Sequence, residues 1–193
     1  MSDPRVAVAQ WAPRFLADGL PADDVEDLRA AIERGEDWCR AWSARAGLHE
    51  ALGKDCLGKG YRLSAGEHLA LAALCYRFAG LLPGTDERQR QAVRIKAVEA
   101  YDAALPCLRP PGEKVRIASG KEELQAVLRL PQSPGRVPVL VMLPDGGSAK
   151  EELHAEQEPF LARGIAVLSL DGGEQAGAAA RVWIGRQTDQ DAA

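Results

Sequence analysis

Val137-Pro-Val-Leu-Val-Met-Leu143 is a continuously apolar stretch, and a second one follows at Ile165-Ala-Val-Leu-Ser-Leu170. Such runs are typical of strands that helices cover on both faces of a sheet. Between them, Ser148-Ala-Lys-Glu151 has the spacing of a capping box, which predicts a helix that ends near Arg163-Gly164. Strand, helix and strand form a βαβ unit, whose crossover we expect to be right-handed.

Two alternating segments precede this unit and predict a β-hairpin. Residues 113–118 and 123–130 alternate between polar and apolar side chains, as half-buried strands do. Ser119-Gly120 between them has the composition of a tight turn. We therefore expect an antiparallel hairpin at the edge of the sheet that contains the two buried strands.

The N-terminal half of the chain is predicted to be helical throughout. Apolar residues at helical spacing over 25–32 predict one helix, and a longer one is expected from Glu36 to Lys54. Ser64-Ala-Gly-Glu67 reads as a capping box that starts the next helix. Thr85-Asp86 is expected to open the last helix, which ends near Pro106.

The helix-breaking segment Leu108-Arg-Pro-Pro-Gly112 divides the chain, because prolines and glycine end helices and allow the chain to change direction. The predicted organisation is a helical domain over 1–109, a sheet domain over 110–175 and an atypical tail over 176–193. Within the tail, residues 181–184 are predicted to pair weakly as a strand. The fold class is therefore α/β, with an all-helical N-terminal domain before the hairpin and the βαβ unit.

Composition excludes several classes of protein. The 193 residues are 46% hydrophobic and 27% charged, as expected of a globular protein. A net charge of −4 and 5% aromatic residues argue against a nucleic-acid partner. The longest apolar run has seven residues against roughly 20 for a membrane span. The N-terminus has no pattern of a secretory signal, so we expect a cytoplasmic protein.

The cysteines and histidines predict neither a metal site nor a cofactor. The four cysteines include no C-x-x-C pair, which favours reduced thiols over a disulfide framework. The three histidines are too far apart in sequence to suggest a metal motif.

Gly146 and Gly147 are the candidate site residues, because they lie between a buried strand and the start of a helix. Backbone N–H groups at such a position can bind a phosphate or stabilise an oxyanion. Glycines after a strand also simply make the turn, and that interpretation stays open. The loop is neither a G-x-x-x-x-G-K-[ST] phosphate loop nor a G-x-G-x-x-G dinucleotide motif.

Three segments of the chain resemble the α/β-hydrolases that carry a helical N-terminal domain. They are Leu128-Arg-Leu-Pro131, the strand-loop-helix segment Val139–Glu152 and the segment Phe160–Gly177. The resemblance covers roughly residues 36–175. It implies a cap that shapes the substrate pocket, and one oxyanion-hole donor at Gly146 or Gly147. The implied substrate is a small carbonyl compound, either an ester or a molecule with a carbon–carbon bond beside a ketone. Such proteins are often homodimers.

The catalytic serine of that family is missing from the sequence. No serine is flanked by glycines in the G-x-S-x-G pattern, and no acid and histidine follow in the required order. We therefore expect the N-terminal portion of a truncated hydrolase, inactive as given, with an open sheet edge where the nucleophile strand belongs. The alternatives are a helical protein-binding module with a small α/β appendage, or a split enzyme whose partner supplies the missing strand.

Overall fold

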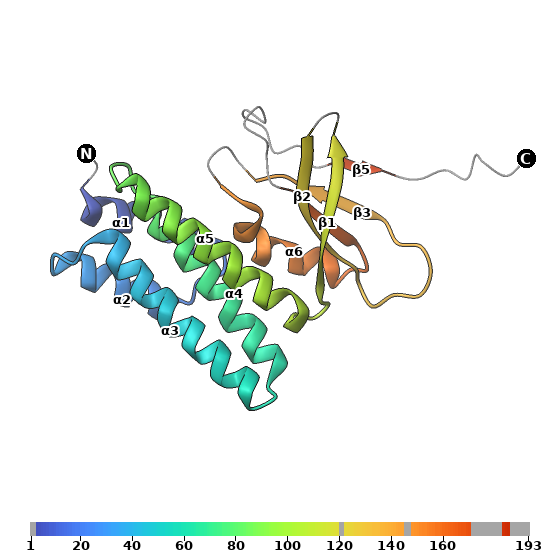
Figure 1. Cartoon of the computed structure of the whole chain (residues 1–193), viewed down its shortest axis with the longest axis horizontal. Coiled ribbons are helices and arrows are strands. Elements are labelled where there is room, and N and C mark those ends of the chain that lie inside the picture. Colours follow the sequence, from blue (N-terminus) through green and yellow to red (C-terminus); the bar gives the residue numbers. More distant parts are fainter. Residues whose placement is uncertain (1–2, 120–121, 145–147, 171–182, 186–193) are drawn as a thin grey trace, which may run out of the picture. The chain divides into compact units, whose positions relative to one another are not determined.

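The computed structural model describes residues 3–119, 122–144, 148–170 and 183–185 (Figure 1). The chain forms two compact units, Met1–Arg109 and Pro110–Ala193. The first unit is helical and the second contains a sheet, which confirms the predicted fold class. Each unit is described separately below.

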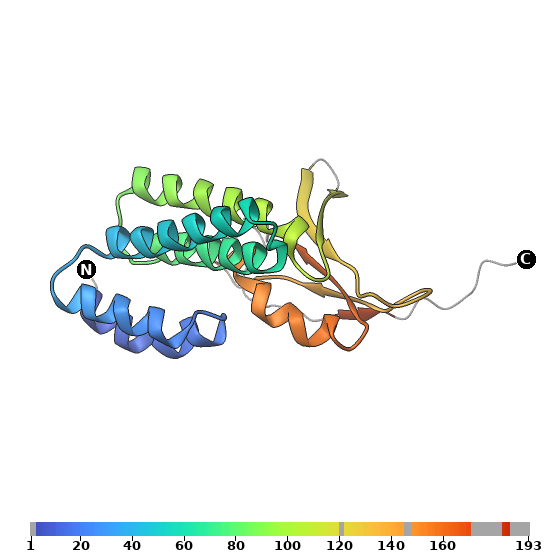
Figure 2. The same ribbon diagram turned by 90° about the horizontal axis from the view of Figure 1, so that it is seen from below.

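The helical unit consists of two short helices followed by three longer ones. The helices α3, α4 and α5 run alongside one another, and α1 packs against α2 (Figures 1 and 2). A short 3₁₀ turn, η1, ends the unit and contacts α4 and α5. The bounds are α1 Pro4–Ala17, α2 Ala22–Glu33, α3 Trp38–Gly58, α4 Arg62–Ala79, α5 Glu87–Ala104 and η1 Leu105–Cys107.

Four aromatic side chains form the centre of this unit. Phe15 on α1 packs against Trp42 on α3 and Phe78 on α4, with ring centroids 4.7 and 4.6 Å away. Trp38, on the same face of α3 as Trp42, donates its indole N–H to the Phe78 carbonyl oxygen over 2.8 Å. The two tryptophans are 2% and 0% exposed, so they belong to the core and not to a binding surface.

Two predicted helix boundaries in this unit are wrong. The helix α4 begins at Arg62, after Tyr61, so Ser64 lies inside the first turn and does not cap it. Gly60 adopts a left-handed conformation with φ of 81°, which turns the chain before Tyr61. The helix α3 continues to Gly58, beyond Lys54, because its packing outweighs the low helix propensity of the internal glycines. The predicted start of the last helix at Thr85-Asp86 is confirmed, and the structure shows Asp86 as its cap, since its carboxylate accepts the N–H groups of Arg88 and Gln89.

The second unit contains a five-stranded sheet of order β1-β2-β4-β3-β5 among the described residues. The hairpin of β1 and β2 is antiparallel, and β3 pairs in parallel with β4, with Val139 opposite Ala166 and Met142 opposite Ser169. The predicted hairpin and βαβ unit are therefore confirmed. The bounds are β1 Gly112–Ser119, β2 Glu122–Arg129, β3 Val139–Met142, β4 Ala166–Leu170 and β5 Trp183–Gly185.

The predicted open edge beside β3 is wrong. The strand β5 pairs with β3 in antiparallel orientation, with Val141 opposite Trp183 and Val139 opposite Gly185. This strand comes from the tail region in which a weak strand was expected. The sheet is therefore mixed: β3 and β4 are parallel, and each has an antiparallel neighbour on its other side, β5 beside β3 and β2 beside β4.

The helix α6 (His154–Leu161) and the preceding 3₁₀ turn η2 (Lys150–Leu153) connect β3 to β4. The apolar core between them and the sheet contains Leu140, Met142, Leu153, Leu161 and Val167. The expectation that β3 is covered on both faces is wrong within the described residues. Val139 is 37% exposed while the alternate residue Leu140 is 2% exposed, because neighbouring strand residues point to opposite faces.

Candidate active site

The loop between β3 and η2 is the predicted site. Gly146 and Gly147 lie outside the described residues, as does the second glycine segment at 171–173. The described residues that flank the loop are Pro144, at the end of the strand, and Ser148, before the turn. What the structure determines is how the chain is held on the helical side of the loop.

A reciprocal pair of hydrogen bonds fixes that side. The carboxylate of Glu152 accepts the N–H of Ala149 over 3.0 Å, and the carbonyl oxygen of Ala149 accepts the N–H of Glu152 over 2.9 Å. The cap position is therefore Ala149, one residue after the predicted Ser148. The correction has a simple cause: in this pair the backbone carbonyl of the cap residue replaces the hydroxyl that the sequence pattern assumes.

Three consecutive charged side chains follow the loop and are buried. Lys150 and Glu151 form an ion pair of 2.7 Å at 8% and 2% side-chain exposure, and Glu152 is 6% exposed as a residue. Charged residues are almost never buried unless they are paired, and a buried pair resists losing either partner. These contacts therefore fix the chain directly after the loop. The sequence identified these residues only as a helix start and missed their burial.

A second buried charge lies at the end of β2. The side chain of Arg129 is fully buried. Its Nε and Nη2 atoms donate to the carbonyl oxygen of Pro110 over 3.2 and 3.0 Å, and Nη1 donates to Glu158 on α6 over 2.7 Å. Nη1 also lies 3.3 Å from Oε1 of Gln157. One guanidinium thus ties the first residue of the unit to β2 and α6.

His154, which is partly buried, and Ser169, which is buried, lie near Gln157 and Arg129 and are unsuited to act as base and nucleophile. Burial lowers the pKa of His154 to about 4; the charge of Arg129 also lowers it, and Glu158 opposes the shift. The imidazole is therefore neutral at pH 7, but so low a pKa makes it a weak base. Ser169 on β4 is fully buried, and its hydroxyl lies 3.4 Å from the Val127 carbonyl oxygen and from the Gln157 amide nitrogen. A nucleophile needs an exposed hydroxyl beside a base.

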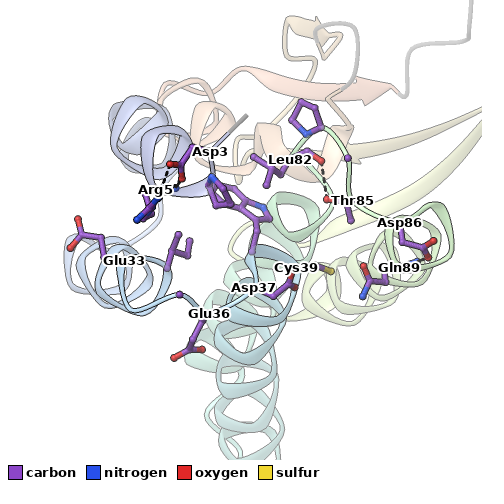
Figure 3. A pocket seen from close by; sticks show the side chains of 16 residues that line it. Asp3, Arg5, Glu33, Glu36, Asp37, Cys39, Leu82, Thr85, Asp86 and Gln89 are labelled. Carbon is purple, nitrogen blue, oxygen red and sulfur yellow. Dashed lines mark hydrogen bonds and ion pairs between the residues drawn. The ribbon is translucent and has the colours of Figure 1, made fainter. Parts of the chain in front are cut away.

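The helical unit contains a cavity of about 530 Å³ (Figure 3). Trp38 and Leu82 are among its apolar lining residues, and none of the predicted site residues lies there. Three of its five acidic lining residues are helix caps, because Asp3, Asp37 and Asp86 each accept a backbone N–H group at the start of a helix. These three carboxylates therefore have a structural role at the starts of α1, α3 and α5.

The described residues include no group of three or more histidine, cysteine or acidic side chains that could hold a metal ion. The cysteines at 39, 56, 75 and 107 are all free. No helix among the described residues is long and apolar enough to cross a membrane.

No protein-family model matches the chain, but individual relatives do. The 2,6-dihydropseudooxynicotine hydrolase of Paenarthrobacter nicotinovorans is 33% identical over 171 residues, which span 88% of this chain and 45% of that protein. The hydrolyase poxO of Penicillium oxalicum is 33% identical over 147 residues, which span 71% of this chain and 34% of that protein.

A solved structure of 2,6-dihydroxy-pseudo-oxynicotine hydrolase superposes with a TM-score of 0.74 and 31% identity. The match covers 82% of this chain and 44% of the hydrolase chain. The chain thus spans less than half the length of the relatives that it matches. Sequence and fold agree on one conclusion: the chain is homologous to the N-terminal portion of the α/β-hydrolases that carry a helical N-terminal domain.

Proposed function

We propose that this chain forms the helical cap and the oxyanion-hole side of a serine α/β-hydrolase that acts on a small carbonyl substrate. The substrate is an ester or a compound with a carbon–carbon bond beside a ketone. The observation that carries the proposal is the match of 82% of the chain, at a TM-score of 0.74, to a hydrolase named for a small molecule. The named substrate of that relative is the first compound to test.

In this proposal the loop after β3 stabilises the charge that develops on the substrate. Attack on a carbonyl places negative charge on its oxygen, and a preorganised N–H group lowers the energy of that state. Gly146 or Gly147 supplies the donor. The buried ion pair Lys150–Glu151 and the hydrogen bonds between Ala149 and Glu152 support this role, because they hold the chain directly after the loop through buried contacts.

The nucleophile of the proposed reaction is not among the 193 residues, because none of their serines has the G-x-S-x-G pattern. Without a serine and its base, only binding and oxyanion-hole effects remain. The chain by itself is therefore proposed to be inactive as a serine hydrolase.

A chimera tests both statements. Residues 1–170 of this chain replace the matched segment of the Paenarthrobacter enzyme, which keeps its own catalytic residues. We expect the chimera to hydrolyse the relative's substrate. In the presence of the 193-residue chain alone, that substrate and a nitrophenyl ester should be hydrolysed only at the rate measured without protein. Release of nitrophenol by the purified chain in proportion to its concentration would show that a nucleophile exists within it.

Substitutions in the chimera test the loop. Gly146→Pro and Gly147→Pro each delete one backbone N–H, and the variant that removes the oxyanion donor should lower kcat about 10²- to 10³-fold. Gly146→Ala and Gly147→Ala are the matched controls, because alanine keeps the N–H. If both proline variants keep the kcat of their alanine controls, the loop supplies no donor.

We also propose a cytoplasmic location and a homodimer. The free cysteines, of which Cys39, Cys75 and Cys107 are buried, support a reducing compartment. The net charge of −4 favours a small-molecule ligand over nucleic acid. The homodimer rests on the family resemblance, and light scattering of the purified protein measures it directly. Trp38 and Trp42 are buried, so neither side chain supports the alternative of a protein-binding helical module.

A further inference from the structure

Three helices of the first unit are joined by a chain of hydrogen bonds through two histidines. Nε2 of His49 on α3 lies 2.7 Å from a carboxylate oxygen of Asp24 on α2. Nδ1 of His49 lies 3.2 Å from Nδ1 of His68 on α4, with the ring centroids 5.4 Å apart. Asp24 and His49 are buried, at 7% and 6% exposure, whereas His68 is partly exposed.

Charged groups around this chain keep Asp24 an acceptor. Arg45, one turn before His49 on α3, donates to the other oxygen of Asp24 over 3.0 Å and to Asp27 over 2.6 Å. Arginine is always charged in proteins, so its partner is a carboxylate. On α4, burial and the charge of Asp24 raise the pKa of the Cys75 thiol, which stays neutral. Glu50, next to His49 in sequence, pairs instead with Lys54 and Tyr76.

This geometry dictates where the ring protons lie. A carboxylate only accepts, so Nε2 of His49 carries a hydrogen. When that ring is neutral, its Nδ1 is an acceptor, and His68 must donate from its own Nδ1. The same contact survives one added proton, because either ring can become the cation while the other accepts. Two added protons leave two N–H donors facing each other, with their nitrogens 3.2 Å apart, on two positively charged rings whose centroids are 5.4 Å apart, and the hydrogen bond is lost.

We propose that His49 and His68 form a proton-binding pair that holds one added proton but excludes a second while α2, α3 and α4 remain packed. The pair then acts as a pH-sensitive link in the helical unit. Unfolded histidines each take up a proton near pH 6.5. Stability should therefore fall as pH drops through this range, because the unfolded chain binds one proton more than the folded pair. This inference is independent of the proposed hydrolase function.

Nitrogen-15 NMR of the full chain tests the proton positions directly. The sequence contains only three histidines, so each ring can be assigned from single substitutions. At pH 8.5 we expect His49 as the Nε2–H tautomer and His68 as the Nδ1–H tautomer. If His68 is the Nε2–H tautomer at that pH while the His49 ring is neutral, both facing Nδ1 atoms are acceptors or the hydrogen-bond chain is reversed, and the proposal is wrong.

The pH dependence of unfolding tests the exclusion of the second proton. His68→Gln is the control, because its amide can still bond to Nδ1 of His49 but does not titrate. Between pH 6 and 5, the ratio of the unfolding equilibrium constants, wild type over His68→Gln, should rise nearly tenfold, which is the linkage of one proton. Contributions from other groups cancel in this ratio. A ratio that stays constant means that the folded pair binds both protons, which overturns the proposal.

Discussion

Replacing Arg129 by methionine should destabilise the second unit by about 3 kcal/mol. The change removes a fully buried guanidinium but keeps much of its aliphatic stem. The carbonyl oxygen of Pro110, a partly buried residue, loses two donors from the fully buried guanidinium, and an acceptor left without a partner on the buried side costs about 1–3 kcal/mol. The loss at Gln157 and Glu158 adds about 1 kcal/mol, because Glu158 is 46% exposed and regains water.

Hydrogen–deuterium exchange followed by mass spectrometry measures this effect where it occurs. A loss of 3 kcal/mol should speed exchange in the peptides of β2 and β4 about 10²-fold, since 1.4 kcal/mol corresponds to a factor of ten. Peptides of the helical unit serve as the internal reference. Arg129→Lys is the matched control, which keeps the charge and one bond but not the two-pronged contact with Pro110 and should lose about 1–2 kcal/mol.

Two results would refute this reasoning. Exchange in Arg129→Met that stays within threefold of the wild type would mean that the buried contacts contribute no net stability. If exchange in Arg129→Lys is as fast as in Arg129→Met, the two-pronged geometry of the guanidinium matters and its charge does not.

Further predictions concern single positions. Gly66→Ala should lower the free energy of unfolding by about 1–3 kcal/mol, because the added Cβ would lie 2.9 Å from the carbonyl carbon of Cys107. Gly47→Ala should raise it by about 0.5–1 kcal/mol, because the added Cβ meets nothing within 4 Å and alanine favours a helix. Equal shifts in Tm for the two variants would contradict both predictions. Burial lowers the pKa of folded His154 to about 4, so the wild type should lose up to about 3 kcal/mol of its free energy of unfolding between pH 6.5 and 4. His154→Gln should lose less over this range. If the free energy of unfolding, measured with urea, falls equally with pH in both proteins, this prediction is contradicted. Asp86→Ala should cost about 1 kcal/mol in urea denaturation and Asp86→Asn little, because asparagine still caps α5; equal losses would contradict a capping role.

Local patterns predicted the elements well where one physical rule dominates. The hairpin, the βαβ unit and the start of the last helix at Thr85-Asp86 follow from side-chain periodicity and from the need to satisfy the first N–H groups of a helix. The cap at Ser64 failed because Gly60 and tertiary packing begin α4 two residues earlier. The cap at Ser148 failed by one residue, because a backbone carbonyl serves where a hydroxyl was expected.

The sequence by itself determined the two-part organisation, the class of fold and the family, because apolar periodicity and a glycine loop between a strand and a helix are local properties. It also revealed that no G-x-S-x-G serine is present. Only the tertiary structure decided that Arg129, Lys150 and Glu151 are buried and that Asp24 and His49 meet. Burial and partners depend on segments far apart in the chain, and a charged residue looks the same in a sequence whether water or another charge surrounds it.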